Sequence, residues 1–172
     1  MESITEEIMS TLKNLEDLFE HQLKDIYSAE NQIIAAFPKM IEHAFSDKLK
    51  KAFRYHLEET EVHVERLKNI GSEFNTHVTG ETCKGMKGLI SEAEAFINED
   101  TERNIRDAGL IANAQRMEHY EIAAYGTVVE YAKVLGYREA ARLLEQSLQE
   151  ERNADEKLTD LAVEMMNMKA KV

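Results

Sequence analysis

Four long stretches of the chain repeat apolar residues every three or four positions, the spacing that places side chains on one face of an α-helix. A shorter amphipathic stretch, MKGLISEAEAFINE, covers residues 86–99. Ser46 and Asp47 are a suitable start for the second long stretch, and Gly71 and Gly136 are suitable stops for the second and third. We therefore predict one short helix and four long helices, which cover residues 8–45, 46–71, 101–135 and 137–168.

The connections between these helices predict a particular bundle. The first two long helices are joined tightly, and so are the last two, so each pair should form an antiparallel hairpin. About thirty residues separate the hairpins, enough to run the length of a bundle. Two hairpins with one long crossover are the ferritin-like arrangement. The predicted fold class is all-α: a ferritin-like four-helix bundle with a fifth short helix in the crossover, as one domain over residues 1–172.

Composition and charge narrow the range of possible functions. Hydrophobic residues make up 43% of the chain, and one proline and seven glycines leave little material for the turns of an all-β protein. The net charge of −12 argues against a nucleic-acid partner, because phosphates would be repelled. Cys83 is the only cysteine, so no intrachain disulfide can form. The N-terminal sequence has no signal-peptide pattern and the chain has no long apolar run, so we expect a cytoplasmic protein that does not enter membranes.

Each long helix carries acids or a histidine on the stripe that should be apolar. Counted from a first turn near residue 46 and a second near Gly136, four of the glutamates lie 13 to 16 positions from their own hairpin turn. At 1.5 Å per residue they share one level of the bundle, roughly 20–24 Å from the turns. Side chains at one level of a narrow core must meet. The polar stripe residues are Glu30 on the first helix, His56 and Glu59 on the second, Glu118 and Glu121 on the third, and Glu151 and Asp155 on the fourth.

Clustered ionised carboxylates in a core repel one another and lose hydration, at about several kcal/mol per ion. Either some of them hold protons or cations neutralise them. Two divalent ions would reduce the charge of five glutamates from −5 to −1. Oxygen ligands with one imidazole suit iron or manganese. We favour two iron ions, with manganese as the alternative.

Other interpretations of these residues stay open. The acids can instead form a metal-free network of hydrogen-bonded or protonated carboxyl groups. His56 is either a ligand or a histidine bonded to one of the acids, and Asp155 is either a ligand or a partner of one. His63 shares the stripe, and for it we favour a core role over a ligand role. Tyr125 lies one turn from Glu121, and for it we favour simple packing.

Four runs of the sequence resemble a known family. They are LEDLFEHQLKDIYSAENQI, FRYHLEETEVHVERL, RDAGLIANAQRMEHYEIAAYGT and LLEQSLQEERNADEKLTDLA, and the resemblance covers nearly the whole chain, from about residue 11 to 165. In motif and in order they are similar to the YciE/YciF-type bacterial stress proteins of the ferritin-like, rubrerythrin-related superfamily. The resemblance implies a closed bundle, usually dimeric, with a carboxylate-bridged dimetal centre.

Carried over residue by residue, the resemblance makes Glu30 the first-helix ligand and Glu59 and Glu151 the bridging glutamates. Glu118 and Glu121 reproduce a Glu-x-x-Glu pair. The chain departs from the superfamily's Glu-x-x-His pattern, because Val62 follows Glu59 and Ala154 follows Glu151 at the histidine positions.

Three functions follow from this pattern. The first is a non-haem dimetal oxidoreductase, peroxidase- or catalase-like, that handles peroxide or oxygen under stress. The second is an iron-binding protein, and the third is a structural helical stress protein that acts by association. For all three we expect a homodimer.

Overall fold

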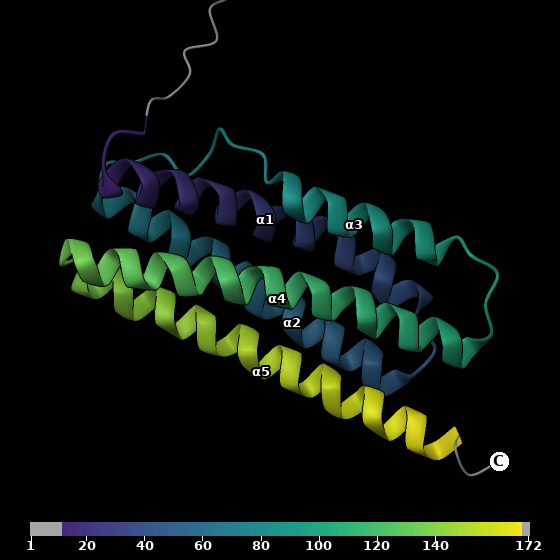
Figure 1. Cartoon of the computed structure of the whole chain (residues 1–172). Coiled ribbons are helices and arrows are strands. Elements are labelled where there is room, and N and C mark those ends of the chain that lie inside the picture. The colour runs from purple at the N-terminus through teal and green to yellow at the C-terminus, as the bar shows by residue number, and fades with distance from the viewer. Residues whose placement is uncertain (1–11, 170–172) are drawn as a thin grey trace, which may run out of the picture.

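The computed structural model describes residues 12–169, with side chains through Met165, and that range contains five helices and no strand. In chain order they are α1 (Leu15–His43), α2 (Asp47–Glu73), α3 (Lys84–Ile97), α4 (Arg103–Leu135) and α5 (Arg138–Lys169). Figure 1 shows α1 and α2 as one antiparallel hairpin and α4 and α5 as the other. The short helix α3 lies in the crossover and packs against α1 and α4. The predicted bundle of two hairpins, with a fifth short helix in the crossover, is confirmed.

Local sequence explains where most helices begin and end. Asn14 caps α1, because its side chain accepts a hydrogen bond of 2.8 Å from the Asp17 backbone N–H. Ser46 caps α2 in the same way through the N–H of Leu49. Gly136 ends α4 with a φ of 78°, a left-handed conformation that glycine adopts without strain. The predicted start at Ser46 and the predicted stop at Gly136 are therefore correct.

Among the predicted boundaries that differ from the structure, two have an identifiable physical reason. Helix α1 begins at Leu15, where the Asn14 cap stands, and residues 12–14 precede it; the predicted residues 8–11 lie outside the described range. Helix α2 continues through Gly71 to Glu73. A Cβ on Gly71 would lie 2.6 Å from the side chain of Val78, so this glycine permits the following segment to pass closely over the helix. Its role is close packing and not helix termination.

The core consists of two apolar clusters with polar residues between them. One cluster fills the end of the bundle near the α1–α2 turn and includes Phe37, Phe53 and Leu110. The other fills the end near the α4–α5 turn and includes Phe19 and Val128. Each large apolar side chain buried in these clusters contributes about 1.5–3 kcal/mol. The two clusters thus offset the cost of the polar layer between them.

No helix within residues 12–169 has both the length and the apolar character that crossing a bilayer requires.

Candidate metal centre

Six acidic or imidazole side chains from all four long helices are buried in the layer between the two apolar clusters. On α1 this layer lies between Ile26 and Ile33, which belong to different clusters, and on α4 it lies between Met117 and Tyr125. Each residue has at most 4% of its surface exposed, so water does not solvate the charges. The six are Glu30 of α1, His56 and His63 of α2, Glu118 and Glu121 of α4, and Glu151 of α5.

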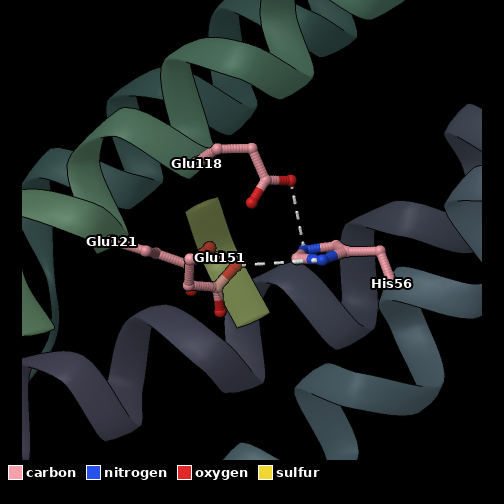
Figure 2. Close-up of side chains that lie close together, drawn as sticks. All are labelled: His56, Glu118, Glu121 and Glu151. Carbon is pink, nitrogen blue, oxygen red and sulfur yellow. Dashed lines mark ion pairs between the residues drawn. The ribbon is translucent and has the colours of Figure 1, made fainter. Parts of the chain in front are cut away.

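The first of two overlapping groups contains four of these residues. One ligand atom from each of His56, Glu118, Glu121 and Glu151 lies within 4.8 Å of every other. Nε2 of His56 is 3.3 Å from Oε1 of Glu118, and Nδ1 of the same ring is 3.8 Å from Oε2 of Glu151. Figure 2 shows these side chains pointing toward one another from three helices. This spacing accommodates one metal ion.

The second group consists of Glu30, His63 and Glu151, whose ligand atoms again lie within 4.8 Å of one another. Nδ1 of His63 is 3.2 Å from Oε1 of Glu30 and 2.8 Å from Oε1 of Glu151. Because Glu151 belongs to both groups, the two groups share one carboxylate.

The other nitrogen of His63 is held from outside the centre. Nε2 is 2.9 Å from Oε2 of Glu150. Arg66 donates to both oxygens of Glu150, with 3.0 Å between Nη2 and Oε1, and its Nη1 also lies 3.1 Å from the Ser147 hydroxyl. A metal-binding histidine commonly donates its second N–H to a carboxylate, which fixes the ring. Glu150 and Arg66 provide that arrangement here.

Burial and charge shift the pKa values of these groups strongly. Burial, followed by the charges of Glu151 and Glu30, raises the pKa values of Glu118 and Glu121 well above the usual range. For His63, burial acts to lower the pKa, but hydrogen bonds and charge from Glu151 and Glu30 raise it to about 11. Without a cation, the acids on α4 would therefore hold protons and His63 would be an imidazolium.

The pKa values of His56 and Glu151 are lowered. Burial lowers the pKa of His56, against the opposing charges of Glu151 and Glu30, so this imidazole is neutral and has a lone pair to offer a metal. The pKa of Glu151 is lowered as well: burial acts to raise it, but a hydrogen bond and charge from His63 and a hydrogen bond from Glu118 outweigh that effect. Glu151 therefore stays ionised.

Unpaired polar atoms show whether the residues suit a cation. Among the described residues, nine buried side-chain nitrogen or oxygen atoms lack a hydrogen-bond partner, and eight of them belong to the six residues of the centre. Both oxygens of Glu121 and both of Glu151 are in this set. Buried polar groups are nearly always paired, so a layer of unpaired ligand atoms fits metal binding. Carboxylate oxygens together with imidazole nitrogens suit iron or manganese.

The structure brings together five of the residues singled out from the sequence: Glu30, His56, Glu118, Glu121 and Glu151. Glu59 lies outside both groups. It is half-buried beside Tyr55 and lies about 60° round the helix from His56 at 100° per residue. The structure therefore does not place Glu59 in the bridging position that the resemblance implied.

Asp155 also lies outside both groups. Its Oδ2 is 3.2 Å from Nε2 of His119, and its Oδ1 accepts a hydrogen bond of 3.3 Å from Gln115. Both partners come from α4 and hold the carboxylate at the edge of the α4–α5 contact. Asp155 is half-exposed there and pairs with neighbours outside the centre.

His63 is the residue that the sequence interpretation undervalued. It lies seven positions after His56, within about 20° of it round the helix, so the two rings share one face. Thr60 stands between them on that face, and its hydroxyl donates to the His56 carbonyl oxygen at 2.9 Å. The seven-residue spacing from His56, which places both rings on one face, is the sequence signal that could have identified His63.

Tyr125 does more than the packing that we expected. It is fully buried on α4 and its hydroxyl donates a hydrogen bond to Oε1 of Glu30. Its pKa is raised well above the usual value, by burial first and by the Glu30 charge second, so the phenol keeps its proton. Tyr125 thereby orients the α1 carboxylate toward the centre.

Comparison with known proteins identifies the relatives of this chain. The family model described as "Domain of unknown function (DUF892)" matches residues 14–171. Protein YciF of Escherichia coli is 49% identical over 161 residues, which cover 92% of this chain and 96% of YciF. The resemblance to YciE/YciF-type proteins is therefore confirmed.

Solved structures agree with this relationship. The crystal structure of the E. coli stress protein YciF superposes with a TM-score of 0.89 at 46% identity and covers 92% of this chain and 100% of its own. YcfI of Rhodopseudomonas palustris gives 0.85 at 41% identity, with 88% and 96% covered. A dodecameric thioferritin, the bacterioferritin-related protein of Bacteroides fragilis, gives 0.71 at 16% identity, with 92% and 91% covered; at that identity it shows the ferritin-like fold alone. The chain belongs to the DUF892 family, and its fold is a ferritin-like helical bundle.

Proposed function

We propose that this protein holds two metal ions between its four long helices and uses them to handle peroxide or dioxygen in a stressed cell. The observation that carries the proposal is the pair of buried ligand groups that share Glu151. The stress context comes from the description of E. coli YciF as a stress protein, and the two chains are 46% identical. We favour iron, with manganese as the alternative, because both accept oxygen and imidazole ligands.

These residues would form two metal positions. His56, Glu118 and Glu121 would hold one ion, Glu30 and His63 the other, and Glu151 would bridge them. Bound iron or manganese would exchange electrons with peroxide, taking two electrons from one molecule, which leaves as dioxygen, and giving two electrons and two protons to another, which leaves as two waters. The protein's own contribution is a dry, rigid layer: two apolar clusters exclude water on either side, while Tyr125 and Glu150 fix individual ligands.

A metal-free structural role is the second function that an observation favours. His63 as an imidazolium lies between Glu30 and Glu151, and Glu118 and Glu121 with raised pKa values would be protonated. Such a layer is compensated without any ion. In this case the protein would act by association, as a homodimer in our proposal, and would catalyse nothing. Simple iron binding without turnover lies between the two functions.

Metal content and peroxide consumption, measured on protein purified from its native host without chelators, separate these functions. The proposal predicts about two iron or manganese ions per chain and removal of hydrogen peroxide that stops when the metal is extracted. Two ions without peroxide or dioxygen consumption would leave a binding protein. Protein that contains no metal and takes up none on addition would refute the proposal in favour of the structural role. Mass measurement in solution tests the expected dimer.

A further inference from the structure

A recess of about 230 Å³ opens between α2 and α5 on the His56 side of the candidate metal centre. Its outer part is lined by Tyr55, which is 54% exposed. Its inner part is lined by His56 and Glu118, which are 4% and 1% exposed. The recess therefore leads from the protein surface to two residues of the centre. The other side of the centre is covered by Glu150 and Arg66.

The recess exists because small side chains face each other where α2 packs on α5. Ala52 of α2 and Ala154 of α5 line it, and neither fills the space that a larger residue would occupy. Phe53 and Leu158, both buried, form apolar walls. An apolar hollow of this kind favours the hydrocarbon part of a ligand.

Polar groups gather at the opening of the recess. The Lys157 ammonium lies over the Tyr55 ring, 4.9 Å from its centroid, and the Glu59 carboxyl lies beside Tyr55. One cationic and one acidic side chain offset each other, so the opening offers no net charge that would compensate a charged ligand when it leaves water. The Asn153 amide also lines the recess and can donate and accept hydrogen bonds.

We propose that this recess binds a small uncharged aromatic molecule that carries a hydroxyl group, of which phenol is the simplest. A cavity of about 150 Å³ is enough for benzene in a protein interior. The recess of about 230 Å³ therefore has room for a substituted ring. The ring would lie against Ala52 and Ala154, and its hydroxyl would reach the polar groups at the opening. The proposal goes beyond the function proposed above, because binding requires the recess and not a metal ion.

The test is a titration of the full metal-free chain with phenol, followed by NMR of its methyl groups. We expect saturable shifts at the methyl groups of Ala52 and Leu158, and none at Val134, which is 74% exposed on α4. Ala154→Leu fills the recess and should weaken binding at least tenfold. Ala162→Leu changes another half-buried alanine of α5 that does not line the recess, and it should bind phenol like the wild type.

Benzoate provides a second arm that does not depend on any variant folding. It has the size of phenol with an added negative charge, and we expect it to bind at least tenfold more weakly. Equal binding of phenol and benzoate, shifts that do not saturate, or full phenol binding by Ala154→Leu would each overturn the proposal. Because the titration uses metal-free protein, its result is independent of whether the chain proves to be a metalloprotein.

Discussion

Nδ1 of His63 lies 2.8 Å from Oε1 of Glu151, which joins the middle of α2 to the middle of α5 inside the bundle. The contact is fully buried on both sides. Glu151 also faces His56 on its other oxygen, at 3.8 Å. One carboxylate therefore lies between two imidazoles, and the two ligand groups of the candidate centre meet at this residue.

Glu121→Ala and Glu59→Ala should differ in metal content. Glu121 offers two unpaired oxygens to the first ligand group, whereas Glu59 lies outside both groups. We expect Glu121→Ala to lose at least one of two ions per chain and Glu59→Ala to keep both, as measured by elemental analysis after identical loading. Loss of metal from Glu59→Ala with retention in Glu121→Ala would reverse the assignment.

Glu121→Leu should stabilise the metal-free protein. The substitution replaces a buried carboxyl group without hydrogen-bond partners by an apolar group of similar size. We expect a gain of about 1–3 kcal/mol in the free energy of unfolding, measured by urea denaturation with a chelator present. Glu130→Leu, an exposed position on the same helix, should change stability by less than about 0.5 kcal/mol. A destabilised Glu121→Leu variant would show that this acid is well paired in the metal-free core.

Glu150→Gln should weaken metal binding although Glu150 is not itself in a ligand group. It removes the charge that faces Nε2 of His63 and that Arg66 holds in place. Changes to such supporting residues typically cost about 10–100-fold in metal affinity. Glu145→Gln, on the exposed side of α5, should leave the affinity unchanged. Equal affinities of the two variants in a competition assay with a chelating dye would exclude a supporting role for Glu150.

The metal-free protein should lose stability as the pH rises above neutral. The pKa of His63 is raised from 6.5 to about 11 in the folded state, so its contribution is complete below pH 6.5 and is lost between pH 6.5 and about 11. The raised pKa values of Glu118 and Glu121 act with the same sign above pH 4.5. Urea midpoints at pH 7, 8 and 9 should fall for the wild type and fall less for His63→Gln. Parallel curves would contradict the imidazolium assignment.

The helices could be predicted because their signals are local. The apolar spacing, the Ser46 cap and the Gly136 stop depend on neighbours in the sequence, and the structure has all three. Gly71 was misinterpreted because its reason is tertiary: the contact with Val78 exists only when the following segment folds back over α2. A glycine that ends a helix and a glycine that permits close packing cannot be told apart in the sequence.

The centre was predicted in its level and in most of its residues, because each long helix carries its acids at a similar distance from a hairpin turn. The structure brings His63 and not Glu59 into the ligand groups, which distance from the hairpin turn alone could not predict. Round α2, Glu59 lies about 60° from His56 and His63 lies about 20° from it. Which of them faces the interior depends on how α2 is rotated against its neighbours. Asp155 is similar, because Gln115 and His119 of another helix decide its direction.

Anomalous X-ray diffraction at the iron and manganese absorption edges tests the central claim most directly, on crystals of protein purified without chelators. The account predicts two anomalous peaks per chain, one beside His56, Glu118 and Glu121 and one beside Glu30 and His63, with Glu151 touching both. A map without anomalous density in this layer, in which Glu118 and Glu121 instead share protons with neighbouring carboxylates, would contradict it.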